Sequence, residues 1–309
     1  MVININDQNK KDIGTFVNDF ESLAMQTEQL LLDESFKVLD GTNRRKLDEF
    51  DAIVPVIVAN FLEQGRQFVQ NIVPTVYTDG IRKADTLLRR NGETVINKPD
   101  YVQIHQETMQ AQAQTMFDNV RKSAETIQSN SNNLSRQLRR QLNLREQKVL
   151  TPALLKEGND ILKKNLEARG ITGLVDKSGK VWNISRYSKM LSQTEVIRTY
   201  REALFTRLIE NNEDLVRIVH LNYHPECPLC TPWSGKIISL TGKTKGYPTR
   251  AQAEASGLFH PQCDHVEYDV KDTKVTKNPV IKLNKEGINF AQRNGINPQE
   301  LEGNINKGA

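Results

Sequence analysis

The sequence predicts an α+β protein: long N-terminal helical arms, then a small mixed α+β domain held together by zinc, then a polar C-terminal tail. Apolar residues recur at helical spacing with few turn signals from about residue 13 to 168. Short strand patterns begin after Gly170, and cysteines and histidines gather between residues 224 and 265. These patterns divide the 309 residues into regions 1–168, 169–270 and 271–309.

Composition excludes several classes of protein. Hydrophobic residues make up 37% of the chain, no run of 18 apolar residues occurs, and the N-terminus is polar. We therefore expect a soluble protein made in a cytoplasm. The net charge of +4 is too small to indicate nucleic-acid binding by itself. Three cysteines, an odd number, fit a reducing compartment better than a closed disulfide framework.

The first arm carries one apolar stripe in steps of three, four and then seven: Leu47, Phe50, Val54, Ile57, Phe61, Phe68, Ile72 and Val76. Pro55 and Pro74 fall inside it, so we expect the helix to be kinked or broken there, because proline removes a backbone donor. Asn91-Gly92 marks the turn to the second arm.

The second arm, about 99 to 148, repeats the stripe near heptad spacing: Met109, Ala113, Met116, Val120, Ala124, Ile127, Leu134 and Leu138. The remaining positions are rich in Gln, Asn and Ser, and so narrow a stripe packs against one or two neighbours. Two interpretations stay open: a plain antiparallel bundle, or an arm that docks on a larger assembly.

A basic run ends this arm, in which five basic residues outnumber the single acid Glu146: Arg136, Arg139, Arg140, Arg145 and Lys148. Such a run is usually a solvated helix face, but it also suits contact with the phosphate backbone of double-stranded DNA. No aromatic residue is interleaved, so base stacking is not expected.

The third part of the chain reads as short strands and helices. Strand patterns lie on both sides of a glycine turn within 173–182, and at 216–221, 236–240 and 266–270. Ser185 is expected to cap a helix that ends at Asn211-Asn212, and a short helix covers 249–255. From Lys271 onward we expect a basic, polar tail on a surface or disordered.

Six of the eight cysteines and histidines form a metal-site pattern: His224-Pro-Glu-Cys227-Pro-Leu-Cys230, then 29 residues, then His260-Pro-Gln-Cys263-Asp-His265. The Cys-x-x-Cys places two thiolates at adjacent corners of a tetrahedron, and the second cluster supplies the others. We predict Zn²⁺ bound by three cysteines and one of two histidines, with His224 beside the site: Cys227, Cys230, Cys263 and either His260 or His265.

Four protein ligands close the coordination sphere, which makes such a zinc structural. The alternatives are weaker. A redox Cys-x-x-Cys lacks its usual βαβ context, and a metal-dependent nuclease requires an open coordination position at His260 or His265.

Three stretches of the sequence resemble the phage head morphogenesis, or minor capsid protein, family, including its Mu F-like, portal-associated members. They are Ser192-Gln-Thr-Glu195 with the helix that follows it, Cys227-Pro-Leu-Cys-Thr-Pro-Trp-Ser-Gly235, and Phe259-His-Pro-Gln-Cys-Asp-His265. The chain departs from the family's usual arginines at Gln193 and Asp264. The resemblance covers roughly residues 190 to 270.

The resemblance implies a non-enzymatic protein of the virion, located in the capsid interior near the portal vertex and in the host cytoplasm during assembly. Its implied partner is the phage portal protein, and its role is in head assembly and in DNA packaging or ejection. The basic run adds packaged double-stranded DNA as a second partner. Neither a membrane nor a small-molecule substrate is expected. A zinc-containing module whose main task is DNA binding is the alternative.

Overall fold

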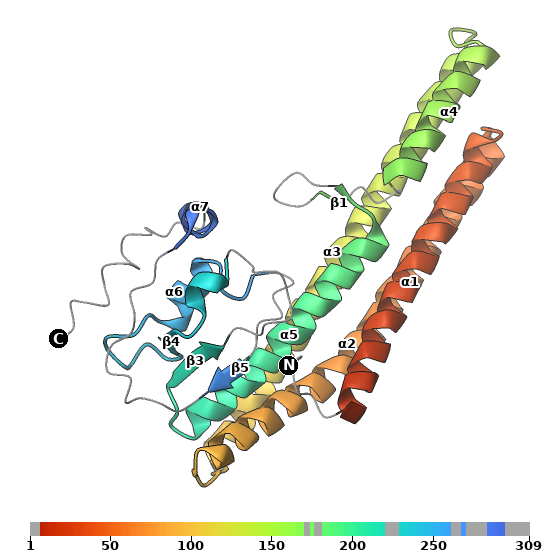
Figure 1. Ribbon diagram of the computed structural model, residues 1–309. Coiled ribbons are helices and arrows are strands. Elements are labelled where there is room, and N and C mark those ends of the chain that lie inside the picture. The colour runs from red at the N-terminus through yellow and green to blue at the C-terminus, as the bar shows by residue number, and fades with distance from the viewer. Residues whose placement is uncertain are drawn as a thin grey trace. The chain divides into compact units, whose positions relative to one another are not determined.

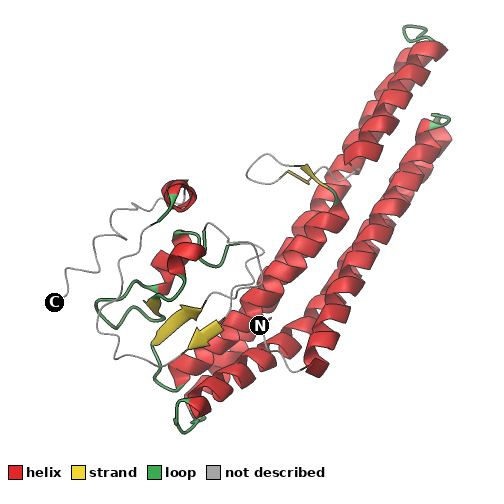
Figure 2. Cartoon of the chain, viewed as in Figure 1, coloured by secondary structure: helices red, strands yellow, loops and turns green. Residues whose placement is uncertain are grey.

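A computed structural model describes residues 7–169, 174–175, 181–219, 229–260, 267–269 and 283–293. Helices dominate the described chain (Figures 1 and 2). The α-helices are α1 (Asp7–Leu39), α2 (Arg44–Arg90), α3 (Pro99–Glu146), α4 (Pro152–Arg169), α5 (Ile184–Glu210), α6 (Arg250–Ala255) and α7 (Lys285–Arg293). The remaining elements are β1 (Leu174–Val175), β2 (Val181–Trp182), β3 (Leu215–Val219), the 3-10 helix η1 (Thr231–Trp233), β4 (Ile237–Ser239) and β5 (Glu267–Asp269).

The chain forms two compact units that interleave along the sequence. The bundle unit comprises residues 14–72 and 113–192, and the sheet unit comprises 1–13, 73–112 and 193–309. Helices α1, α2, α3 and α5 contribute to both units. The sequence patterns predicted three consecutive regions, 1–168, 169–270 and 271–309, and that division stays a prediction. No helix in the described part of the chain has the length and hydropathy that a membrane crossing needs.

The predicted apolar stripes form the core of the bundle unit. From Leu47 to Ile72 every residue of the first stripe is buried, and the second stripe is buried from Met116 to Leu138. Phe20 of α1 completes this core, with its ring stacked on that of Phe68 at 4.6 Å between centroids. Hydrophobic periodicity therefore identified the helices and their inward faces.

Helix α2 continues through Pro55 and Pro74, so of the two expectations, a kinked or a broken helix, the break is wrong and the kink stays a prediction. Both prolines are exposed, and the carbonyl groups that lose a partner one turn earlier belong to Asp51 and Gln70, which are exposed as well. Water can satisfy those groups, and the buried stripe on the opposite side holds the helix together.

Toward one end of the bundle unit, the α1–α2 turn lies beside the last residue of α3 and the middle of α4 (Figure 1). Arg44 forms a two-nitrogen contact with the Glu146 carboxylate, with the shorter bond at 2.6 Å. The buried Asn159 amide donates to the Leu39 carbonyl and to Thr42 Oγ1, at 2.9 and 3.0 Å. These contacts fix the register of the arms.

The sheet unit contains a three-stranded antiparallel sheet in the order β4-β3-β5. All three strands were predicted to within two residues where the structure describes them. Thr249 caps α6 through a capping box with Gln252, as the predicted short helix requires. The two short strands predicted around the glycine turn, β1 and β2, pair antiparallel and lie in the bundle unit.

Two local predictions need correction. Helix α5 is capped by Asn183, whose Oδ1 accepts the N–H of Arg186, whereas Ser185 lies inside the helix and contacts Glu28. The C-terminal region contains helix α7, capped by Asn284 through the N–H of Gly287 and preceded by the buried Leu283. This cap and a short apolar repeat were missed because the surrounding sequence is polar and rich in lysine and asparagine.

Candidate functional site

Only part of the predicted zinc site falls on described residues. Cys227, Cys263 and His265, as well as His224, lie outside them. Cys230 is buried in the turn that precedes η1, and His260 is half-buried after α6. Among the described residues no group of three or more potential metal-binding side chains occurs. The zinc site therefore remains a prediction.

The flanks of the two predicted clusters nevertheless meet in the structure. Gly257 has a φ of +101°, and a Cβ atom there would lie 3.1 Å from Leu229 Cδ2 and 3.2 Å from Leu229 Cβ. Leu229 directly precedes Cys230, and Gly257 is three residues before His260. A glycine is required here both by the backbone conformation and by the close packing. The 29 residues between Cys230 and His260 therefore form a loop whose two ends lie close together.

Aromatic and charged side chains hold the segment before His260 against α5. The Arg201 guanidinium stacks over the Phe259 ring at 3.8 Å, and the Phe205 ring lies 6.2 Å from that of Phe259. Phe259 adopts a left-handed φ of +64°, a conformation that needs support from its neighbours. The Arg201 and Phe205 contacts supply it.

Arg250 of α6 provides a second attachment to α5. Its guanidinium is paired with Glu202 and with Glu254 and lies 4.9 Å from the Phe205 ring centroid. Burial alone would lower the pKa of Arg250, but the two carboxylates outweigh it and raise that pKa. Arg250 is therefore a permanently charged anchor.

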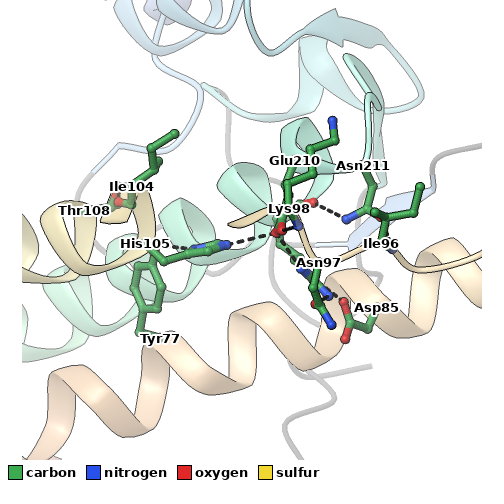
Figure 3. A network of polar contacts seen from close by, with 11 residues as sticks. Tyr77, Asp85, Ile96, Asn97, Lys98, Ile104, His105, Thr108, Glu210 and Asn211 are labelled. Atoms are coloured by element: carbon green, nitrogen blue, oxygen red, sulfur yellow. Dashed lines mark hydrogen bonds and ion pairs between the residues drawn. The ribbon is translucent and has the colours of Figure 1, made fainter. Parts of the chain in front are cut away.

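A polar network joins the α2–α3 connection to the end of α5 within the sheet unit (Figure 3). Arg207 donates to Asp85 and Asn97, each at 2.7 Å, and is paired with Glu210. Glu210 also accepts the N–H of Lys98 at 2.7 Å and faces His105 Nε2 at 3.1 Å.

The network extends from His105 to Tyr77 and fixes two protonation states. Tyr77 Oη lies 2.9 Å from His105 Nδ1, and burial raises the pKa of Tyr77 to about 12. Burial would also raise the pKa of Glu210, but the bonds from Arg207, Lys98 and His105 outweigh it and lower that pKa. A neutral tyrosine and an ionised glutamate therefore flank His105. This arrangement is a structural clamp.

Asp214 organises the loop that follows β4. Its carboxylate accepts hydrogen bonds from the hydroxyls of Ser239, Thr241 and Thr244 and from the N–H of Thr241. Desolvation opposes ionisation, but these four bonds prevail and lower the pKa of Asp214 to about 2. The conformation of this loop therefore depends on the ionised carboxylate of Asp214.

The basic run predicted to contact DNA divides into two groups. Arg139 donates to Asp48 at 2.7 Å and to Asp51 at 2.6 Å, and Arg136 donates to Asn133. Arg140, Arg145 and Lys148 are exposed, and none of the three has an ion-pair partner in the described part of the chain. Nothing in this arrangement tests DNA binding, which stays a prediction.

Sequence reasoning missed the clamp around Glu210 and the Asp214 loop. Their members come from segments more than 100 residues apart in the first case, and they match no motif. The Ser192–Glu195 stretch did single out a buried carboxylate. Burial raises the pKa of Glu195, and Arg198, 3.9 Å away, opposes the shift. The resemblance of this stretch to the family's helix was the signal that identified it.

Comparison with known proteins gives one match. The family model described as phage minor capsid protein 2 matches residues 53–271, more than half of the chain. The match begins in α2 and ends after β5, so it includes most of the helical arms, which sequence motifs alone had related only in general character. No curated protein and no solved structure matches the chain.

Proposed function

The chain belongs to the phage minor capsid protein 2 family, and from this premise we propose that it binds the portal inside the phage head and assists head assembly and DNA packaging or ejection. The match over residues 53–271 carries this proposal, since family membership makes the chain a structural component of a virion. No catalytic step forms part of the proposed role.

The bundle unit supports a docking role. Its arms are fixed by a continuous apolar core and by cross-links such as Arg44–Glu146 and Lys163–Asp40. A protein held in this way can present its surface to a partner without rearranging, which lowers the entropy that binding costs.

The test of portal binding is a pull-down of purified portal oligomer of the same phage by the purified chain. We expect the portal oligomer and the chain to be recovered together in a fixed molar ratio. If the folded chain stays in the supernatant at micromolar concentrations of both proteins, the portal assignment is wrong, although membership of the family would stand.

We also propose a structural Zn²⁺ held by Cys227, Cys230 and Cys263 together with His260 or His265. The packing of Leu229 on Gly257 supports it, because it brings the flanks of both clusters together. Trp233, three residues after Cys230, is fully buried, and its indole N–H has no acceptor among the described residues. A site rich in thiolate sulfur supplies acceptors of the kind that such a donor needs. The ion would link the segment before η1 to the segment after α6.

Metal quantification tests this site. We expect one zinc per chain, lost in Cys227→Ser and Cys263→Ser but kept in the control His224→Ala. Of His260→Ala and His265→Ala, only the variant that removes the fourth ligand should lose zinc. Full zinc content in both cysteine variants would refute the site.

A further inference from the structure

The turn between α3 and α4 ends the bundle unit in an exposed tip, which we define as residues 140–157. Asn159 of α4 bonds to Leu39 and Thr42 of the α1–α2 turn. Pro152 begins α4 seven residues earlier, which corresponds to about 10 Å of helix. The tip therefore extends past the α1–α2 turn (Figure 1).

The tip exposes apolar side chains that a helix turn ordinarily covers. Helix α3 ends in a Schellman motif: Val149 N–H donates to the Leu144 carbonyl at 2.9 Å, and Lys148 N–H donates to that of Arg145. The motif brings Leu144 and Val149 together, yet their exposed fractions are 41% and 67%. Leu154, in the first turn of α4, is 52% exposed. Three large apolar side chains thus face solvent within eleven residues.

Lys148 occupies a position in this motif that favours glycine. Its φ is +59°, in the left-handed region that costs backbone energy for any residue with a Cβ atom. Glycine at this position would relieve that cost without changing the hydrogen bonds. A lysine here places a positive charge at the apex of the tip instead.

The charge around the apolar side chains is positive on balance. The tip contains four bases, Arg140, Arg145, Lys148 and Lys156, against two acids. One of those acids, Glu146, is already paired with Arg44. The charges at the tip that remain after this pairing are therefore positive on balance, and they surround an apolar centre. This composition is expected of a protein-binding surface.

We propose that the tip is the surface through which the chain binds the portal, in an apolar hollow of the portal that is rimmed by carboxylates; this inference rests on the proposed function. A protein partner explains the apolar side chains, which a phosphate backbone would leave exposed to water. The complementary charge on the partner accounts for the lysine at the strained position.

The experiment compares two triple variants of the full chain in the portal pull-down. Leu144→Ser/Val149→Ser/Leu154→Ser alters the tip, and Met25→Ser/Leu30→Ser/Val56→Ser alters equally exposed residues elsewhere in the bundle unit. We expect the tip variant to lose about 10-fold or more in affinity and the control to bind like the wild type. Circular dichroism should show both folded, since every changed side chain is exposed.

Wild-type binding together with equal binding by the tip variant would overturn the inference and leave the proposed function intact. If the wild type does not bind the portal, the proposed function and the inference that rests on it both fail. Loss of binding to a 30-base-pair duplex with unchanged portal binding would also overturn it, since the tip would then be a DNA contact.

Lys148→Gly separates binding from stability. It should raise the melting temperature by about 2 °C, because the left-handed strain is removed, and should weaken portal binding about 3-fold at low salt, because a complementary charge is lost. A stabilised variant with wild-type affinity would overturn the charge contribution of the proposal.

Discussion

The backbone N–H of Lys98 donates to the carboxylate of Glu210 across 2.7 Å, joining residues that lie 112 positions apart. Glu210 is the last residue of α5, and Lys98 directly precedes α3. The same carboxylate is paired with the Arg207 guanidinium and lies within hydrogen-bond distance of His105 Nε2. One buried glutamate therefore positions the α2–α3 connection, two long helices and the entry to β3.

Glu210→Gln should lower the free energy of unfolding by about 2 to 4 kcal/mol, because it removes the charge that Arg207 faces in a buried site. Urea denaturation followed by circular dichroism measures the loss. Glu107→Gln is the control: Glu107 is exposed on α3 and, among the described residues, bonds only to Gln103 one turn away, so we expect a change below about 0.5 kcal/mol. Equal losses in both variants would contradict the clamp.

Acid should destabilise the sheet unit through Asp214. Its pKa falls from 3.8 to about 2 on folding, so its contribution is present above pH 4 and disappears as the pH falls toward 2. Asp214→Asn should cost about 1 to 2 kcal/mol at pH 7, after allowance for solvent screening, and should flatten the dependence of stability on pH between 4 and 2. Asp160→Asn, at an exposed position of α4, should leave that dependence unchanged.

Two helical glycines should respond oppositely to alanine. A Cβ on Gly80 of α2 would overlap the Tyr200 carbonyl oxygen and the Ala203 Cβ of α5. Gly80→Ala should therefore cost about 1 to 3 kcal/mol. Around Gly158 of α4 the nearest neighbour is Gln141 Nε2 at 3.6 Å, so Gly158→Ala should stabilise by up to about 1 kcal/mol. Thermal unfolding of both variants measures the contrast. Stabilisation in both would refute the close approach of α2 and α5.

Phe259→Ala should release the segment before His260 and reduce zinc retention during dialysis against a chelator, because the Arg201 and Phe205 contacts are lost. Phe117→Ala is a matched control, since Phe117 also lies under an arginine, Arg66, at 5.0 Å, but belongs to the bundle unit. The control should lower stability without affecting zinc. Identical zinc loss in both variants would show that Phe259 acts only through general stability.

Local patterns predicted the helices and strands well. The stripe from Leu47 to Ile72 is buried, the turn forms at Asn91-Gly92 and α5 ends before Asn211. The prolines do not break α2, because the cost of a missing backbone bond depends on whether the freed carbonyl meets water, and a sequence does not show that. Helix α7 was missed because a single cap and a single turn of apolar spacing are weak signals in a lysine-rich segment.

Of the candidate site, only the residues whose sequence spacing is typical of metal ligands could be predicted. The cysteines and histidines follow the ligand spacing of zinc sites, so the sequence identifies them as a group. The contacts among Asp85, Asn97, Arg207 and Glu210 depend on tertiary packing, and no spacing rule relates them. The apolar tip was also missed, because the two leucines lie outside the stripe that ends at Leu138 and no motif marks an exposed leucine: Leu144 and Leu154.

The interleaving of the two units along the chain limits how this protein can be dissected. A fragment starting near residue 193 would contain the sheet and the cysteine cluster but would lack Asp85, Asn97 and Lys98, and so would leave Arg207 and Glu210 with an incomplete set of partners. A fragment ending near residue 168 would keep the arms but lose the start of α5, whose Lys189 pairs with Glu21. Co-expressed halves that reassociate are therefore a better way to study the bundle unit and the sheet unit than single truncations.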